Sequence, residues 1–202
     1  MKKKKFIVLI SLLILVFLFI TYLVVVGKTN SFDNIIYKII RSLESDFCDK
    51  YFIFITKFGN IDVVIGMVIC LIFAFRNRHA IMVTTLVINS AITNQLVKHI
   101  ILRDRPNVLR LIEQGGYSYP SGHTMIAICL YGYLLYLAFT KINNKFIKYI
   151  CSIILFVLIL SISVSRIYVG VHYASDVAGG LVLALIELLL LIDFSKKQFR
   201  GN

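Results

Sequence analysis

The chain has no tryptophan, two prolines and four cysteines in its 202 residues. None of the cysteines forms a CxxC pair or shows the Cys/His spacing of a zinc site; they are Cys48, Cys70, Cys129 and Cys151. The last three lie in apolar runs, so we expect them to pack as small apolar side chains. The carboxylates do not cluster in a way that suits a catalytic Mg²⁺ ion. The sequence therefore predicts neither a metal nor another cofactor.

Acidic residues are also scarce. The chain has 22 basic and 10 acidic residues, which gives a formal net charge of +12 at pH 7. The cations are dispersed between apolar segments and are not gathered with stacking aromatics in one soluble domain, as they are in proteins that bind nucleic acids. We therefore do not expect nucleic acid as a partner, and the sequence gives no sign of an obligate protein partner.

Apolar residues make up 59% of the chain, and the mean hydropathy is +0.86. These values exceed those of soluble domains, so most of the chain should be surrounded by lipid. No linker or repeat divides residues 1–202, which predicts a single all-α membrane domain. Six transmembrane helices are expected, at about 6–26, 58–75, 80–97, 122–139, 149–164 and 174–192.

The first apolar stretch could be a signal peptide or a retained helix, since Lys2 to Lys5 precede it. It has 21 uncharged residues, enough to cross about 30 Å of lipid, and no Ala-x-Ala-like cleavage site. We therefore expect a retained transmembrane helix.

Residues 31–47 predict a helix that lies in the membrane interface. Apolar residues recur there at helical spacing, with charged residues between them. Two roles remain open for this helix: a packed cap over the bundle, or a surface that guides lipid to a site.

The cationic flanks of the predicted helices indicate their orientation. Twelve Lys and Arg residues flank the N-terminus, the Arg76–His79 turn, the Lys141–Lys148 loop and the tail, with Asp193 as the nearby acid. On the opposite side ten cations are offset by eight acids. Because Lys and Arg near helix ends are retained in the cytoplasm, both termini are expected to be cytoplasmic.

Three short segments should then meet at the outer side. The first contains Lys98, at the end of a helix whose Ser90 and Asn94 form a polar stripe, and Arg105 before Pro106. Proline disfavours helix at the preceding residue, so Arg105 should lie in a loop and fold back over the helix ends. Its paired donors match phosphate oxygens.

The second segment is Pro120-Ser121-Gly122-His123. It should open a helix whose N-terminal N–H groups and dipole favour an anion. Ser121 can cap that helix, Gly122 allows close backbone approach, and His123 projects an imidazole from the first turn.

The third segment contains Ser165, Arg166, His172 and Asp176. Four-residue spacing on a helix would let Asp176 bind one ring nitrogen of His172 and leave the other nitrogen free to attack. Arg166 would add a second guanidinium to the phosphate site.

Together the segments resemble the type 2 phosphatidic acid phosphatase superfamily. Its three motifs, Lys-x6-Arg-Pro, Pro-Ser-Gly-His and Ser-Arg-x5-His-x3-Asp, match at every specified position. Arg103 also fits a frequent companion in that family. The resemblance implies a metal-independent phosphatase in which His172 attacks phosphorus, Asp176 supports it, His123 is the acid and then the base, and the remaining residues bind the phosphate: Lys98, Arg105, Ser121, Gly122 and Arg166.

The substrate is less closely defined. The resemblance admits undecaprenyl pyrophosphate, phosphatidylglycerophosphate and phosphatidic acid, and the compact form of the chain favours the first by analogy. A lipid phosphotransferase would use the same phosphohistidine. A non-enzymatic lipid-binding or transport protein would need the cations but not the two histidines. The expected location is the cell membrane, with the site outside.

Glu187 falls near mid-membrane on the last predicted helix. A proton relay is one interpretation, and a protonated side chain bonded to Asn89 or Ser90 is the other.

Overall fold

The computed structural model describes residues 3–75 and 78–198. Helices account for most of them, in this order: α1 (Lys3–Val25), α2 (Asn30–Arg41), α3 (Asp46–Thr56), the short 3₁₀ helix η1 (Lys57–Gly59), α4 (Ile61–Phe75), α5 (Arg78–Ile101), α6 (Gly122–Lys141), α7 (Lys145–Tyr168) and α8 (Ala174–Gln198). Parts of the predicted cytoplasmic turn at 76–79 and of both termini lie outside the described residues.

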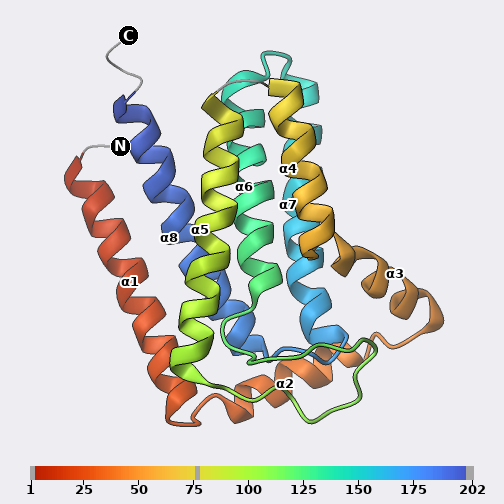
Figure 1. Ribbon diagram of the computed structural model, residues 1–202. Coiled ribbons are helices and arrows are strands. Elements are labelled where there is room, and N and C mark those ends of the chain that lie inside the picture. The colour runs from red at the N-terminus through yellow and green to blue at the C-terminus, as the bar shows by residue number, and fades with distance from the viewer. Residues whose placement is uncertain (1–2, 76–77, 199–202) are drawn as a thin grey trace.

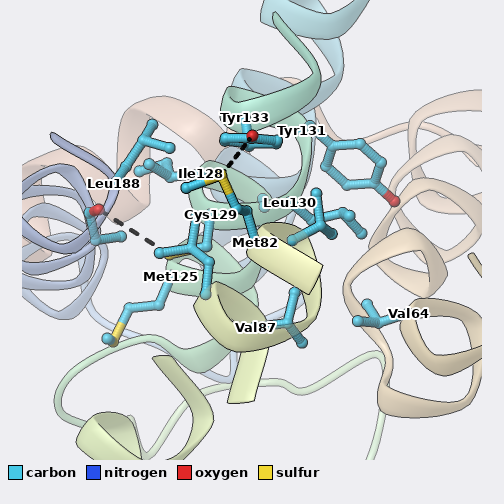
Figure 2. Packing of buried hydrophobic residues seen from close by; sticks show 14 of the residues in the cluster. Val64, Met82, Val87, Met125, Ile128, Cys129, Leu130, Tyr131, Tyr133 and Leu188 are labelled. Atoms are coloured by element: carbon cyan, nitrogen blue, oxygen red, sulfur yellow. Dashed lines mark hydrogen bonds between the residues drawn. The ribbon is translucent and has the colours of Figure 1, made fainter. Parts of the chain in front are cut away.

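Helix α6 is the centre of the bundle. It packs against α5, α7 and α8, and α1 covers the outer side of α8 (Figure 1). Figure 2 shows Val64 of α4, Met82 of α5 and Leu188 of α8 around the side chains of α6. Along α6 even Tyr131 and Tyr133 are buried. The main core is therefore formed around α6, with buried side chains from the helices that enclose it.

The outward faces of the surrounding helices are apolar, with exposed side chains such as Phe19, Ile92 and Phe156. Five described helices are long and apolar enough to cross a membrane: α1, α5, α6, α7 and α8. Large contiguous apolar faces of this kind are stable where lipid covers them. The predicted all-α membrane fold is confirmed.

The second predicted span and the interfacial helix need correction. Helix α2 ends at Arg41, and a separate helix, α3, begins at Asp46, where Ser45 Oγ accepts a hydrogen bond from the Cys48 N–H group at 3.2 Å. Helix α3 with η1 meets α4 at an angle of 53°, and together they have the length and hydropathy of one broken span or a re-entrant loop. The sequence did not predict α3, because charged residues in its first turn interrupt the apolar pattern of the residues that follow.

The two ends of the bundle differ. The start of α1, the end of α4, the start of α5, the α6–α7 connection and the end of α8 share one end (Figure 1). At the other end α2 lies across the bundle, beside the long connection 102–121 and the short connection 169–173. The three special segments all reach this second end.

Glu187 is buried between α5, α6 and α8. Cys129 Sγ lies 3.7 Å from its Oε2 atom, and Ser90 and Thr93 of α5 are close. Ser90 was one of the two predicted neighbours, and the structure places it beside the carboxyl group.

Gly179 of α8 packs directly against Tyr119. An added Cβ at Gly179 would lie 2.4 Å from Tyr119 Oη. The Tyr119 ring is fully buried, stacks on Phe17 and bonds to Thr21 Oγ1 at 2.8 Å, so it has little room to move. We expect Gly179→Ala to reduce the free energy of unfolding by about 1–3 kcal/mol, as overpacking does.

Gly66→Ala in α4 is the matched control, because an added Cβ there meets open space. The free energy of unfolding of Gly66→Ala should equal that of the parent or exceed it by up to about 1 kcal/mol. Thermal unfolding in detergent measures both variants, and equal midpoints would contradict the close packing at Gly179.

Candidate active site

A cavity of about 560 Å³ opens at the second end of the bundle, between α5, α6, the η1–α4 turn and the 102–121 connection. Five of the eight predicted site residues line it: Lys98, Arg105, Gly122, His123 and His172. The other three, Ser121, Arg166 and Asp176, lie behind this wall and are fully buried. The tertiary structure therefore brings the three separate segments to one place.

His172 lies in the tight connection between α7 and α8. The Val171 and His172 N–H groups both donate to the Arg166 carbonyl oxygen, and Gly170, with φ of +76°, makes the turn possible. His172 Nδ1 lies 3.3 Å from Asp176 Oδ2, and Nε2 lies 3.3 Å from Arg105 Nη1. Because a guanidinium only donates, this arrangement favours the proton on Nδ1 and the lone pair on Nε2, which faces the cavity.

The surroundings keep the His172 ring neutral. Burial, followed by the charges of Arg166, Arg105 and Lys98, holds the pKa of His172 well below its usual range. A neutral imidazole can act as a nucleophile once the lone pair of its unprotonated nitrogen is free.

Asp176 stands in the first turn of α8. Its Oδ2 atom also accepts the Tyr173 N–H group at 2.9 Å, and its Oδ1 atom accepts Arg103 Nη1 at 2.6 Å. The carboxylate is thus fixed on both oxygens, and it orients His172 as the four-residue spacing predicts.

His123 projects from the first turn of α6 into the same cavity. Its Nε2 atom bonds to Asn60 Oδ1 at 2.9 Å, and Gly59 lies flat against the ring, where a Cβ would come within 2.6 Å of it. Sequence reasoning missed Asn60, since nothing in the turn that precedes α4 marks a partner for a residue 63 positions later.

Lys98 and Arg105 both bind the loop that covers the cavity. Lys98 Nζ donates to the carbonyl oxygens of Tyr117 and Ser118. The Arg105 guanidinium donates to Gly115 O at 2.8 Å, and to Val171 O at 2.8 Å on the His172 side. Burial lowers the pKa of Arg105 from its ordinary value. The two cations face neutral carbonyl oxygens, which an anion can replace.

Arg166 is fully buried at the end of α7. Its Nη1 atom donates to Thr56 Oγ1 at 2.5 Å and Nη2 donates to Gln114 Oε1 at 3.0 Å. Its Nε atom has no hydrogen-bond partner among the described residues. A buried donor of this kind is costly unless something accepts from it. Neither Thr56 nor Gln114 carried a signal in the sequence.

The start of α6 has the predicted cap. Ser121 Oγ accepts the Thr124 N–H group, and the Gly122 Cα lies so close to Asn94 that a Cβ would approach Oδ1 to 3.0 Å. The Ser121 N–H group itself donates to the Asp176 carbonyl oxygen at 3.0 Å. Ser121 is one of the residues expected to bind the phosphate, but its N–H group is not available for this, because it joins α6 to α8.

The chain is similar to several known proteins. It is 34% identical to phosphatidylglycerophosphatase B of Bacillus subtilis over 109 residues, which are 52% of each protein. It is 35% identical to the bacitracin transport permease protein BcrC of Bacillus licheniformis over 85 residues, 42% of this chain and 37% of that one. The matched region thus spans about half or less of these relatives.

Solved structures match more of the chain. A transmembrane PAP2-type phosphatidylglycerolphosphate phosphatase from Bacillus subtilis superposes with a TM-score of 0.86 at 25% identity, covering 96% of this chain and 98% of that one. LpxE of Aquifex aeolicus, at 23% identity, shares the fold with a TM-score of 0.65 over 78% of this chain and 92% of that one.

The family model of the PAP2 superfamily matches residues 78–200, which include all three motifs. This confirms the resemblance drawn from the sequence: the chain belongs to the PAP2 superfamily of phosphatases.

Proposed function

We propose that the chain hydrolyses a membrane lipid phosphate or pyrophosphate in this cavity, through a phosphohistidine intermediate. The observation that carries the proposal is that His123 and His172 line one cavity together with two cations, and that only His172 is held by a buried carboxylate. From this difference we infer that His172 is the nucleophile and that His123 is the acid and then the base.

In the first step the lone pair of His172 Nε2 attacks phosphorus, and the bond between phosphorus and the lipid oxygen breaks. His123 gives a proton to that oxygen, which leaves as an alcohol or, for a pyrophosphate, as a lipid monophosphate. Asp176 stabilises the positive charge that develops on His172. Phosphate oxygens take over the Arg105 donor that meets Nε2 at 3.3 Å, which frees the lone pair.

In the second step His123 takes a proton from water, and the water oxygen attacks phosphorus. The bond between phosphorus and His172 breaks, inorganic phosphate leaves, and His172 is neutral again. Lys98, Arg105 and Arg166 stabilise the phosphoryl oxygens throughout. Gly122 offers its backbone there, and Ser121 acts through its hydroxyl group, since its N–H group is engaged.

We place the cavity on the extracytoplasmic side and both termini in the cytoplasm. One end of the bundle holds the start of α1, the end of α8 and the α6–α7 connection. Cations are in excess there, and this excess supports the orientation. The cavity then opens at the depth of lipid headgroups, where an amphipathic substrate presents its phosphate.

Three lipid substrates fit the proposal. Undecaprenyl pyrophosphate is the one we propose first, from the compact form of the chain. Phosphatidylglycerophosphate and phosphatidic acid are the alternatives. Similarity to phosphatidylglycerophosphatase B and to the superposed phosphatase supports phosphatidylglycerophosphate, so it is tested beside undecaprenyl pyrophosphate. A phosphotransferase would share the first step and pass the phosphoryl group to a second lipid.

His172→Ala removes the nucleophile, so phosphate release from either lipid should fall by at least about 10³-fold in detergent. His79→Ala is the control histidine, since His79 lies at the opposite end of α5 and bonds to Tyr133. Inorganic phosphate is measured for both lipids with both variants and the parent. Release by folded His172→Ala protein at the parental rate would contradict the mechanism, and acceptor-dependent product without free phosphate would identify a transferase.

Metal removal gives a second test. The cations Lys98, Arg105 and Arg166 supply the charge that a divalent metal would otherwise bring to the phosphoryl group. We expect phosphate release in excess EDTA to stay within about twofold of the untreated rate. Removal of a metal that takes part in the reaction would slow it far more than this. Loss of turnover in EDTA with recovery on adding Mg²⁺ would count against this site.

A further inference from the structure

We propose that Asp33, on the interfacial helix α2, is a positioning residue for the reaction. It acts through Arg103 and the first turn of α8 to hold Asp176 and His172 in their reactive geometry. The inference rests on the proposed function and assigns a task to an acid that lies 143 positions before Asp176 in the sequence.

Asp33 is buried, with 2% of its surface exposed. Its Oδ1 atom accepts the Ser175 N–H group at 2.8 Å. Its Oδ2 atom accepts Ser175 Oγ at 2.8 Å and Arg103 Nη2 at 2.9 Å. Ser175 is the second residue of α8, so its N–H group is one that the helix itself leaves without a partner. Asp33 therefore caps α8 from a different helix.

Arg103 connects Asp33 to the site. While Nη2 binds Asp33, Nη1 donates to Asp176 Oδ1 at 2.6 Å. The guanidinium also lies over the Tyr173 ring, 4.0 Å from its centroid, which restricts its movement. With His172 Nδ1 at 3.3 Å from the other Asp176 oxygen, the contacts form an unbroken line from α2 to the nucleophile.

These contacts also distribute the positive charge of Arg103 between two carboxylates. Arg103 is shared by two carboxylates, so Asp176 keeps part of its negative charge for the imidazolium that forms on His172. Without the charge on Asp33, Arg103 would pair with Asp176 alone. The Ser175 N–H group would also lose its charged acceptor, and the turn that carries Asp176 would be held less firmly.

The backbone next to Arg103 supports a positioning role. Leu102 has φ of +54°, a left-handed conformation that costs free energy for a branched side chain. Strain of this kind persists where the surrounding contacts determine the geometry. At Leu102 the chain turns out of α5, and Arg103 is then held by Thr29, Asp33, Ser175 and Asp176.

The faces of α2 also support the assignment. Phe32, Ile35 and Ile39 are each more than half exposed, as for a helix that rests in lipid, whereas Asp33 points into the bundle. Of the two roles left open by the sequence, the packed cap fits these contacts. The cap is tied to the catalytic pair.

The test compares Asp33→Asn with Asp46→Asn, which removes the exposed acid in the first turn of α3. Loss of an outer-shell partner of a metal-bound histidine costs about 10–100-fold in activity, and we take that range as the scale for His172. We therefore expect kcat to fall by that factor in Asp33→Asn while KM changes by less than about twofold, because the phosphate-binding groups are untouched. Asp46→Asn should match the parent.

Arg103→Lys is the second variant, because an ammonium group is a point charge and does not bridge two carboxylates as a guanidinium does. Arg103→Lys should lower kcat similarly, and the double variant should be no worse than the poorer single one. Losses that multiply in the double variant would overturn the proposal, as would parental kcat in folded Asp33→Asn protein.

A readout independent of turnover separates this proposal from the proposed function. The ¹⁵N chemical shifts of His172 report which ring nitrogen carries the proton. We expect the Nδ1–H form in the parent and Asp46→Asn, and a mixture of tautomers in Asp33→Asn. The same shifts in all three proteins would overturn the positioning role. A parent that hydrolyses neither lipid would overturn the proposed function, while the tautomer change would still support the positioning role.

Discussion

The convergence of buried and half-buried cations at one end of a membrane bundle is the constraint on which the rest of this structure depends. Lys98, Arg105 and Arg166 donate mainly to neutral oxygens of the covering loop and of neighbouring helices. Neutral acceptors compensate a buried charge only in part. The arrangement of helix ends and loops is therefore one that an anion completes, and the two histidines face the place where it would lie.

In the proposed mechanism two carboxylates at this end, Asp33 and Asp176, orient other groups. Asp176 binds His172, and Asp33 shares Arg103 with it. Because these two acids bind Arg103 and the first turn of α8, they do not neutralise Lys98, Arg105 and Arg166. A chain of contacts thus joins the interfacial helix α2 to the proposed catalytic pair of His172 and Asp176.

The sequence predicted most of the apolar spans well, because a helix in lipid needs about 20 consecutive apolar residues and that length is a strong local signal. It was wrong about residues 42–57, where α3 begins at a charged turn capped by Ser45. Contacts across long separations were also out of reach. Asn60 beside His123, and Thr56 and Gln114 beside Arg166, have ordinary side chains in ordinary turns and helices.

The sequence by itself determined the membrane class, the places of the three motifs and the pairing of His172 with Asp176, since each depends on local periodicity or spacing. The tertiary structure decided which nitrogen of His172 faces the cavity, that the Ser121 N–H group is engaged by α8, and that Asp33 caps a helix from a distance. These features depend on how helices far apart in the chain pack together, and helical periodicity carries no record of that packing.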